Sequence, residues 1–105
     1  MANIEANKGV VTQINVFTVA PENQQALIEL LIESTKSVCE LPGWISASIH
    51  RSADGRRVVN YAQAESMEAQ ERIVASLWAN GFLERNKRLG EAHPGLYEVV
   101  YTLTR

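Results

Sequence analysis

Strand-type and helix-type segments follow one another along this chain in the order β-α-β-β-α-β. Residues 10–19 are rich in Val, Ile, Thr and Phe, as strands usually are. Residues 22–40 carry Leu and Val at helical spacing and end at the Leu41-Pro42-Gly43 sequence. The later segments fit two strands, a helix with a short extension and a last strand, over residues 44–51, 57–63, 66–78, 82–90 and 96–104.

The residues between these segments are typical of turns and helix ends. Asp54-Gly55 is a strong hairpin signal, and Ser66 is placed to cap the second helix. Asn80-Gly81 fits the end of that helix, and His93-Pro94-Gly95 predicts a turn before the last strand. These signals support the same order of elements.

The order β-α-β-β-α-β predicts an α+β protein with the ferredoxin-like fold and an antiparallel sheet. Right-handed crossovers place the first and third strands in the centre of that sheet, with the second and fourth outside. A chain of 105 residues has room for one core. We therefore expect a single domain over residues 9–105, preceded by a flexible N-terminal segment, residues 1–8.

Charge and cysteine content argue against several classes of protein. Ten basic and twelve acidic side chains nearly balance, and Arg51, Arg56 and Arg57 form the only basic cluster, so we expect no nucleic-acid partner. Cys39 is the only cysteine, which excludes a disulfide within one chain. Residues 1–8 are polar, unlike a signal peptide, and no apolar run approaches membrane-spanning length. A cytoplasmic location without a membrane partner is the resulting expectation.

Both faces of the predicted strands carry apolar side chains. In the first strand Ile14 and Val16 alternate with Phe17 and Val19, although a sheet with one solvated face should alternate apolar with polar residues. Two helices can cover only one face. The other face predicts a two-fold homodimer, a dimeric α/β barrel, and the alternative is a monomer with a few exposed Val and Tyr side chains.

Asn15 and Asn60 lie in the middle of the two predicted central strands. Asn is depleted in strands, and a buried amide without a partner costs on the order of 1–3 kcal/mol. Two such residues on adjacent strands indicate either a shared polar spot in an apolar region or two paired structural amides. The sequence leaves both interpretations open.

Small side chains beside Asn60 indicate space above the sheet. Ala62 and Ala64 share its strand face, and helix side chains such as Leu77, Trp78 or Phe82 can either fill that space or line a pocket. An apolar cavity with a few convergent polar groups is the usual form of a small-molecule site. Ala62, Ala64, Trp78 and Phe82 are therefore candidate substrate-binding residues.

His50 is the only histidine on a predicted strand, and its facing depends on the hairpin register. A two-residue loop at Asp54-Gly55 pairs Ile49 with Asn60 and puts His50 on the opposite face. A three-residue loop beginning at Ala53 places His50 on the Asn60 face. His50 is thus a candidate site residue in one register and a structural or surface histidine in the other.

Several kinds of site have no sequence signal. One Cys and two distant His do not make a metal cluster, and no Gly-rich phosphate-binding loop is present. No Ser-His-Asp arrangement can be argued from spacing. Chemistry in this protein would therefore rely on neutral amides, one histidine and a dry cavity.

At these residues the chain resembles the antibiotic biosynthesis monooxygenase domain family. The similarity includes Gly43-Trp44 at the strand entry, the stretch from His50 to Asp54 before the hairpin, and the stretch from Val58 to Gln63 leading into Glu65-Ser66. It extends over roughly residues 10–104. Within the family the chain is most similar to the small anthrone oxygenases of aromatic polyketide pathways.

The resemblance implies a homodimer with one pocket per subunit, in which O2 oxidises a polycyclic phenol or anthrone to a quinone. No flavin, haem or metal takes part, because the deprotonated substrate itself reduces O2. Asn15 and Asn60 match pocket asparagines that can hold a carbonyl or enolate oxygen. His50 matches a pocket histidine that can accept a proton, and these three are the candidate catalytic residues.

One position departs from the family pattern. Ala64 stands where the family commonly has a tryptophan that lies in the pocket. This departure keeps a second hypothesis open, namely a non-catalytic protein of the same fold that binds small aromatic ligands. Oxygen uptake with an anthrone distinguishes the two hypotheses.

Overall fold

The computed structural model describes residues 9–105, so the segment expected over residues 1–8 lies outside the described part of the chain. The elements are β1 (Val11–Val19), the short 3-10 helix η1 (Pro21–Asn23), α1 (Gln24–Val38), β2 (Trp44–Arg51), β3 (Arg57–Ala64), α2 (Met67–Ala79), α3 (Phe82–Lys87) and β4 (Gly90–Tyr97). Among the described residues, no helix has the length and apolarity needed to cross a bilayer.

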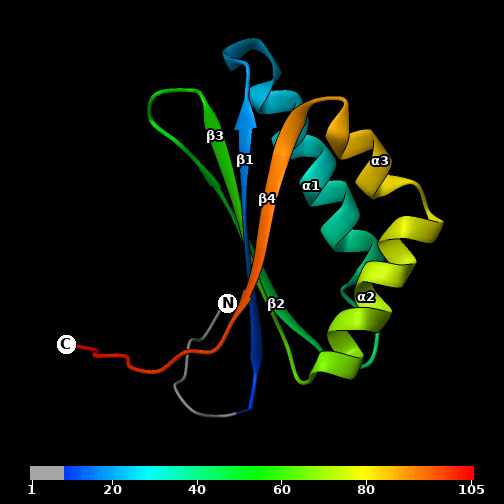
Figure 1. The fold of residues 1–105 in the computed structure, drawn as a ribbon, viewed down its shortest axis with the longest axis vertical. Coiled ribbons are helices and arrows are strands. Elements are labelled where there is room, and N and C mark those ends of the chain that lie inside the picture. Colours follow the sequence, from blue (N-terminus) through cyan, green and yellow to red (C-terminus); the bar gives the residue numbers. More distant parts are fainter. Residues whose placement is uncertain (1–8) are drawn as a thin grey trace.

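The four strands form one antiparallel sheet in the order β2-β3-β1-β4. Figure 1 shows the three helices on one side of this sheet, while the C-terminal residues run away on the other side. The predicted α+β ferredoxin-like fold is confirmed, with β1 and β3 in the centre as expected from the crossover rule.

Local signals in the sequence explain where α2 and β2 begin. The Ser66 hydroxyl accepts a hydrogen bond from the Ala69 N–H at 3.1 Å, as predicted for a helix cap. Gly43 precedes β2 with a φ of 88°, and a Cβ there would lie 2.4 Å from the Ala69 Cβ. Gly43 therefore allows β2 to start directly against the first turn of α2.

The last strand differs from the prediction. We expected a turn at His93-Pro94-Gly95 and a strand over residues 96–104, but all three residues lie within β4, and residues 98–105 have no regular secondary structure. β4 is an edge strand, which is where a sheet tolerates a proline that lacks an N–H. The sequence rule failed because it treated His93-Pro94-Gly95 as a local turn, without the neighbouring strand.

The buried core is divided into two clusters. One contains Phe17, Leu27, Leu31 and Val58. The other, toward the opposite end of α1, contains Val38, Ala64, Ala69 and Ile73. Members of both clusters line a single cavity, which therefore lies between them.

Candidate functional site

Asn15 of β1 and Asn60 of β3 are directly opposite one another in the sheet. Both side chains line the same cavity under the helices. Side chains that face each other across an antiparallel pair have Cβ atoms about 4.5–5.5 Å apart. The two strands thus bring the two carboxamides together. This arrangement agrees with the interpretation of the sequence as a shared polar spot in an apolar region.

The two amides have different surroundings. The Asn15 Oδ1 atom accepts a hydrogen bond from the backbone N–H of His93 in β4 at 3.1 Å. This bond fixes the Asn15 amide so that its nitrogen is left to donate. The Asn60 Oδ1 atom is buried and has no partner among the described residues. Asn60 therefore gains no hydrogen bond from the fold at that oxygen.

The cavity has a volume of about 260 Å³ and is enclosed by the sheet and all three helices. Ala47 and Ala62, which pair across β2 and β3, are the small residues of the sheet surface that leave this space open. The helices contribute mainly apolar side chains, including Leu31, Ile73 and Leu77. An apolar enclosure with a few amides is suited to a flat aromatic molecule with oxygen substituents.

A second hollow of about 540 Å³ adjoins the cavity along α2 and β4. It is more open to solvent, and it shares Gln13, Gln70, Val74, Trp78 and Pro94 with the enclosed cavity. Trp78 is 56% exposed, so its indole stands between the two spaces. This hollow, which we call the α2–β4 groove, gives a ligand room to extend beyond the enclosed cavity.

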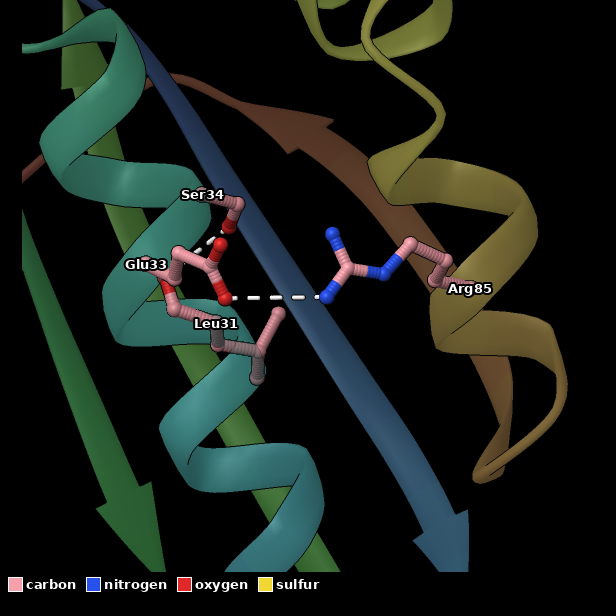
Figure 2. A network of polar contacts seen from close by, with 4 residues as sticks. All are labelled: Leu31, Glu33, Ser34 and Arg85. Atoms are coloured by element: carbon pink, nitrogen blue, oxygen red, sulfur yellow. Dashed lines mark hydrogen bonds and ion pairs between the residues drawn. The ribbon is translucent and has the colours of Figure 1, made fainter.

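One ion pair between exposed side chains links helix α3 to α1. The Arg85 guanidinium lies 3.6 Å from the Glu33 carboxylate of α1 and stacks on the Phe82 ring at 5.3 Å. Figure 2 shows Arg85 and Glu33 reaching toward one another across the space between the two helices. In the same view the Ser34 hydroxyl donates to the Leu31 carbonyl within α1 at 2.9 Å.

The structure places four of the predicted site residues on the cavity wall. These are Asn15, Asn60, Ala62 and Trp78. Ala64 and Phe82 are buried instead and do not line the cavity. Ala64 is 0% exposed and packs in the second core cluster, opposite Trp44 in the register of β2 and β3. Phe82 is buried as well and carries the Arg85 guanidinium on its ring.

His50 lies outside the cavity of this chain. Ile49 pairs with Asn60, so the register is the first of the two alternatives and His50 is on the face that the helices leave uncovered. Its Nε2 atom is 3.0 Å from the Ser48 hydroxyl. The position of His50 gives no support to a role as proton acceptor for the Asn15 and Asn60 pair.

Most of the other cavity residues were missed by the sequence reasoning. Trp44 and Gln70 line the wall from β2 and α2, and Asn86 and Lys87 line it from α3. The place of Trp44 could have been predicted, because Trp44 pairs with Ala64 and the same β2–β3 register sets the sheet face of both residues. The two α3 residues had no such signal, since the direction of a six-residue helix depends on how it packs.

Ionisable groups are scarce at this site. Among residues 9–105, Lys87 is the only ionisable side chain on the wall of the enclosed cavity, and Glu71 is the only one along the α2–β4 groove. In residues 9–105 no three His, Cys, Asp or Glu side chains lie close enough to share a metal ion. The polar character of the described site therefore comes mainly from carboxamides.

Fold and site together define a small α+β domain with a largely apolar ligand cavity between helices and sheet. The model of the antibiotic biosynthesis monooxygenase family matches residues 10–80. The chain belongs to this family.

Three relatives illustrate the similarity. Tetracenomycin-F1 monooxygenase from Streptomyces glaucescens is 45% identical over 67 residues, which are 63% of this chain and 60% of that protein, so the match spans less than two thirds of that relative. SnoaB, a cofactor-independent oxygenase from Streptomyces nogalater, shares the fold with a TM-score of 0.79 at 23% identity, over 92% of this chain and 99% of that one. ActVA-Orf6, a monooxygenase of Streptomyces coelicolor solved with nanaomycin D, has a TM-score of 0.81 at 28% identity, over 93% and 94% of the two chains.

Proposed function

We propose that this protein is a monooxygenase that oxidises a polycyclic phenol or anthrone to a quinone with O2, without flavin, haem or metal. The observation that carries the proposal is the pair of facing carboxamides, Asn15 and Asn60, in an otherwise apolar cavity. Family membership supports it, as do the names of the related tetracenomycin-F1 monooxygenase and of SnoaB, a cofactor-independent oxygenase.

The proposed reaction balances with the substrate as the only reductant. The anthrone methylene loses a proton, and the resulting carbanion passes one electron to O2. The two radicals combine to a peroxide anion at that carbon, which takes back a proton to become the hydroperoxide. The hydroperoxide then loses water to give the second carbonyl of the quinone. One oxygen atom ends in the product and the other in water.

The carboxamides act on the first of these steps. An amide N–H that donates to the carbonyl oxygen of the substrate binds the enolate more strongly than the neutral ketone, which lowers the pKa of the methylene. Asn15 is suited to donate because its oxygen is already engaged by the His93 N–H. The largely apolar surroundings strengthen the same hydrogen bonds.

The alternative is a protein of the same fold that binds aromatic ligands without turning them over. Its specific support is that no indole extends from position 64, where the small Ala64 side chain is packed into the core. Trp44 and Trp78 do line the cavity, so an aromatic ligand has indole surfaces to contact in either case.

An oxygen-electrode assay with anthrone and metal-free, flavin-free protein tests the proposal. We expect oxygen uptake that falls about 10²- to 10³-fold in Asn60→Leu, as when an oxyanion donor is removed elsewhere. Asn23→Leu is the matched control, because the Asn23 side chain makes no cap hydrogen bond and lies outside the cavity. Saturable binding of anthrone without oxygen uptake would establish the binding protein instead. Full turnover in both Asn15→Leu and Asn60→Leu would remove the proposed site.

We also propose that the protein forms a homodimer through the face of the sheet that the helices do not cover. Ile14, Val16, Val59 and Tyr61 lie on this face at the centre of the sheet. Several apolar residues of the C-terminal stretch are largely exposed, among them Tyr101 and Leu103. A contiguous apolar surface of this kind is typical of an interface. The cytoplasmic location expected from the sequence remains a prediction.

A further inference from the structure

Helix α3 presents two adjacent polar side chains to the enclosed cavity, Asn86 and Lys87. They come from the last turn of the helix, whereas Asn15 and Asn60 come from the sheet. The cavity thus has an amide and a charged group on α3 as well as the two asparagines of the sheet, besides the polar side chains of Ser34, Thr35 and Gln70 from α1 and α2.

Asn86 is a buried amide whose oxygen has no partner. The residue is 6% exposed, and its Oδ1 atom makes no hydrogen bond with the described chain. Its backbone carbonyl is already used, since it accepts from the N–H groups of Arg88 and Leu89 at the end of α3. The side chain therefore contributes nothing to the helix end, and a leucine of similar size would avoid an unpaired buried acceptor.

A ligand in the cavity offers Asn86 the missing partner. The terminal torsion of an asparagine is broad, so rotation about χ2 can present either the oxygen or the nitrogen of the amide to the cavity. The side chain can accept from a hydroxyl of the ligand or donate to an ionised oxygen. This matches the chemistry of an aromatic compound with oxygen substituents.

Lys87 adds the only charge on the same wall. Its ammonium group lies 5.4 Å from the centre of the Trp78 ring, which keeps it beside the boundary between the cavity and the α2–β4 groove. No ion pair within residues 9–105 involves Lys87, while the neighbouring Arg88 lies 3.9 Å from Glu84. The lysine charge is therefore available to a ligand.

We propose that Asn86 and Lys87 form a second oxygen-binding end of the cavity, selective for aromatic ligands that carry an ionised oxygen there, a phenolate or a carboxylate. This inference rests on the proposed function in one respect, namely that the ligand is aromatic. A ligand bound between the two ends is oriented, with one oxygen at the sheet asparagines and the other at α3. Orientation of this kind selects the ring carbon that meets O2.

Calorimetric titration with 9,10-anthraquinone-2-carboxylate and its methyl ester tests the charge selection, because neither compound needs to be turned over. We expect the wild type to bind the carboxylate about two- to fivefold more tightly than the ester, the range of a solvent-exposed charge pair such as Lys87 would form. Lys87→Met should remove this preference and Lys87→Arg should retain it. Arg88→Met, which deletes the same charge from the neighbouring position outside the cavity wall, should leave it unchanged.

Three outcomes of this titration overturn the charge selection. They are no saturable binding of the carboxylate by the wild type, an unchanged preference in Lys87→Met, and an equal loss of preference in Arg88→Met, which would show only a diffuse effect of net charge. A parallel titration with a hydroxyanthraquinone and its methyl ether distinguishes a phenolate from a carboxylate as the preferred group.

Asn86→Leu tests the amide separately. If the amide serves the ligand, this variant should unfold at a higher temperature than the wild type and bind the carboxylate at least threefold more weakly. A lower unfolding temperature with unchanged affinity would make Asn86 structural and overturn its role. If the wild type shows the binding preference but takes up no oxygen with anthrone, the proposed function is contradicted and this inference still stands.

Discussion

Asn15 and Asn60 face each other in the sheet, yet the fold uses them differently. The Asn15 oxygen pairs with the His93 N–H, whereas the Asn60 oxygen is buried without a partner. We expect Asn15→Leu to lower the free energy of unfolding by about 1 kcal/mol, because a hydrogen bond to the edge strand is lost. Asn60→Leu should leave stability unchanged or raise it, because an unpaired amide is removed. Urea unfolding monitored by circular dichroism measures both.

The contrast between the two variants carries this prediction. Asn60→Leu destabilising the protein as much as Asn15→Leu would mean that both amides are structural. In that case a loss of activity in Asn60→Leu would no longer indicate a role of Asn60 in the reaction. Asn23→Leu again provides the baseline for an asparagine without a side-chain hydrogen bond.

Ala64 bears on the question of a missing indole. It is fully buried, and Trp44 lies opposite it on the neighbouring strand. We therefore expect Ala64→Trp to destabilise the protein by about 1–3 kcal/mol through overpacking rather than to enhance activity. The double variant Trp44→Ala, Ala64→Trp should recover part of that loss, because it vacates space next to position 64. Thermal unfolding of the two variants measures the difference, and a more active, equally stable Ala64→Trp would contradict it.

At this scale the sequence predicted part of the site. Asn15 and Asn60 could be found because asparagine is unusual within strands and both strands were predicted to be central. The sequence could not decide which face of the sheet carries the His50 side chain, since a shift of one residue in the hairpin register moves that side chain to the other face. Asn86 and Lys87 had no local signal, because only tertiary packing decides which side of a short helix meets the cavity.

Among the elements, the hairpin between β2 and β3 fixes that register. The Asp54 carboxylate accepts hydrogen bonds from the Arg56 N–H at 2.9 Å and from the Ser52 hydroxyl at 2.7 Å. The Ser52 hydroxyl also accepts from the Arg57 N–H at 2.8 Å. These bonds close the turn so that Ile49 pairs with Asn60, which turns His50 away from the cavity.

The hydrogen bonds of Asp54 in this turn predict that the stability of the folded protein depends on pH. The backbone hydrogen bond from Arg56, followed by the one from Ser52, lowers the pKa of Asp54 below its usual value. A carboxyl whose pKa is lowered by folding stabilises the folded state above the unfolded pKa, about 3.9. That stabilisation disappears as the pH falls through the lower pKa of the folded state. Asp54→Ala should therefore unfold at a lower temperature than the wild type at pH 7, and the difference should vanish in strong acid. A constant difference down to pH 2 would contradict this assignment.

Edge strand β4 shows where sequence rules for single elements reach their limit. Seven of the predicted boundaries needed only small adjustments, because propensity and turn residues agree there. The stretch around Pro94 reads locally as a turn, but a sheet edge accepts it and Asn15 supplies an acceptor for the His93 N–H. Only the neighbouring strand makes this stretch a strand.

At the scale of the whole molecule, the proposed dimer interface is the face of the sheet that the helices leave uncovered. Val59 lies at the centre of that face, paired with Val16 across β1 and β3. We expect the wild type to sediment as a dimer and Val59→Asp as a folded monomer, because a carboxylate buried in an apolar interface without a partner is strongly unfavourable. Analytical ultracentrifugation gives the masses, and circular dichroism reports whether the variant is folded.

Ile32→Asp is the matched control for this change. Ile32 is 40% exposed on α1, on the side of the sheet that the helices cover, so the same substitution there should leave the dimer intact. A monomeric wild type, or equal dissociation by both variants, would contradict the proposed interface. Because a dimer that unfolds releases two separate chains, a dimer also predicts that the unfolding temperature rises with protein concentration. Val59→Asp should abolish that concentration dependence and Ile32→Asp should not.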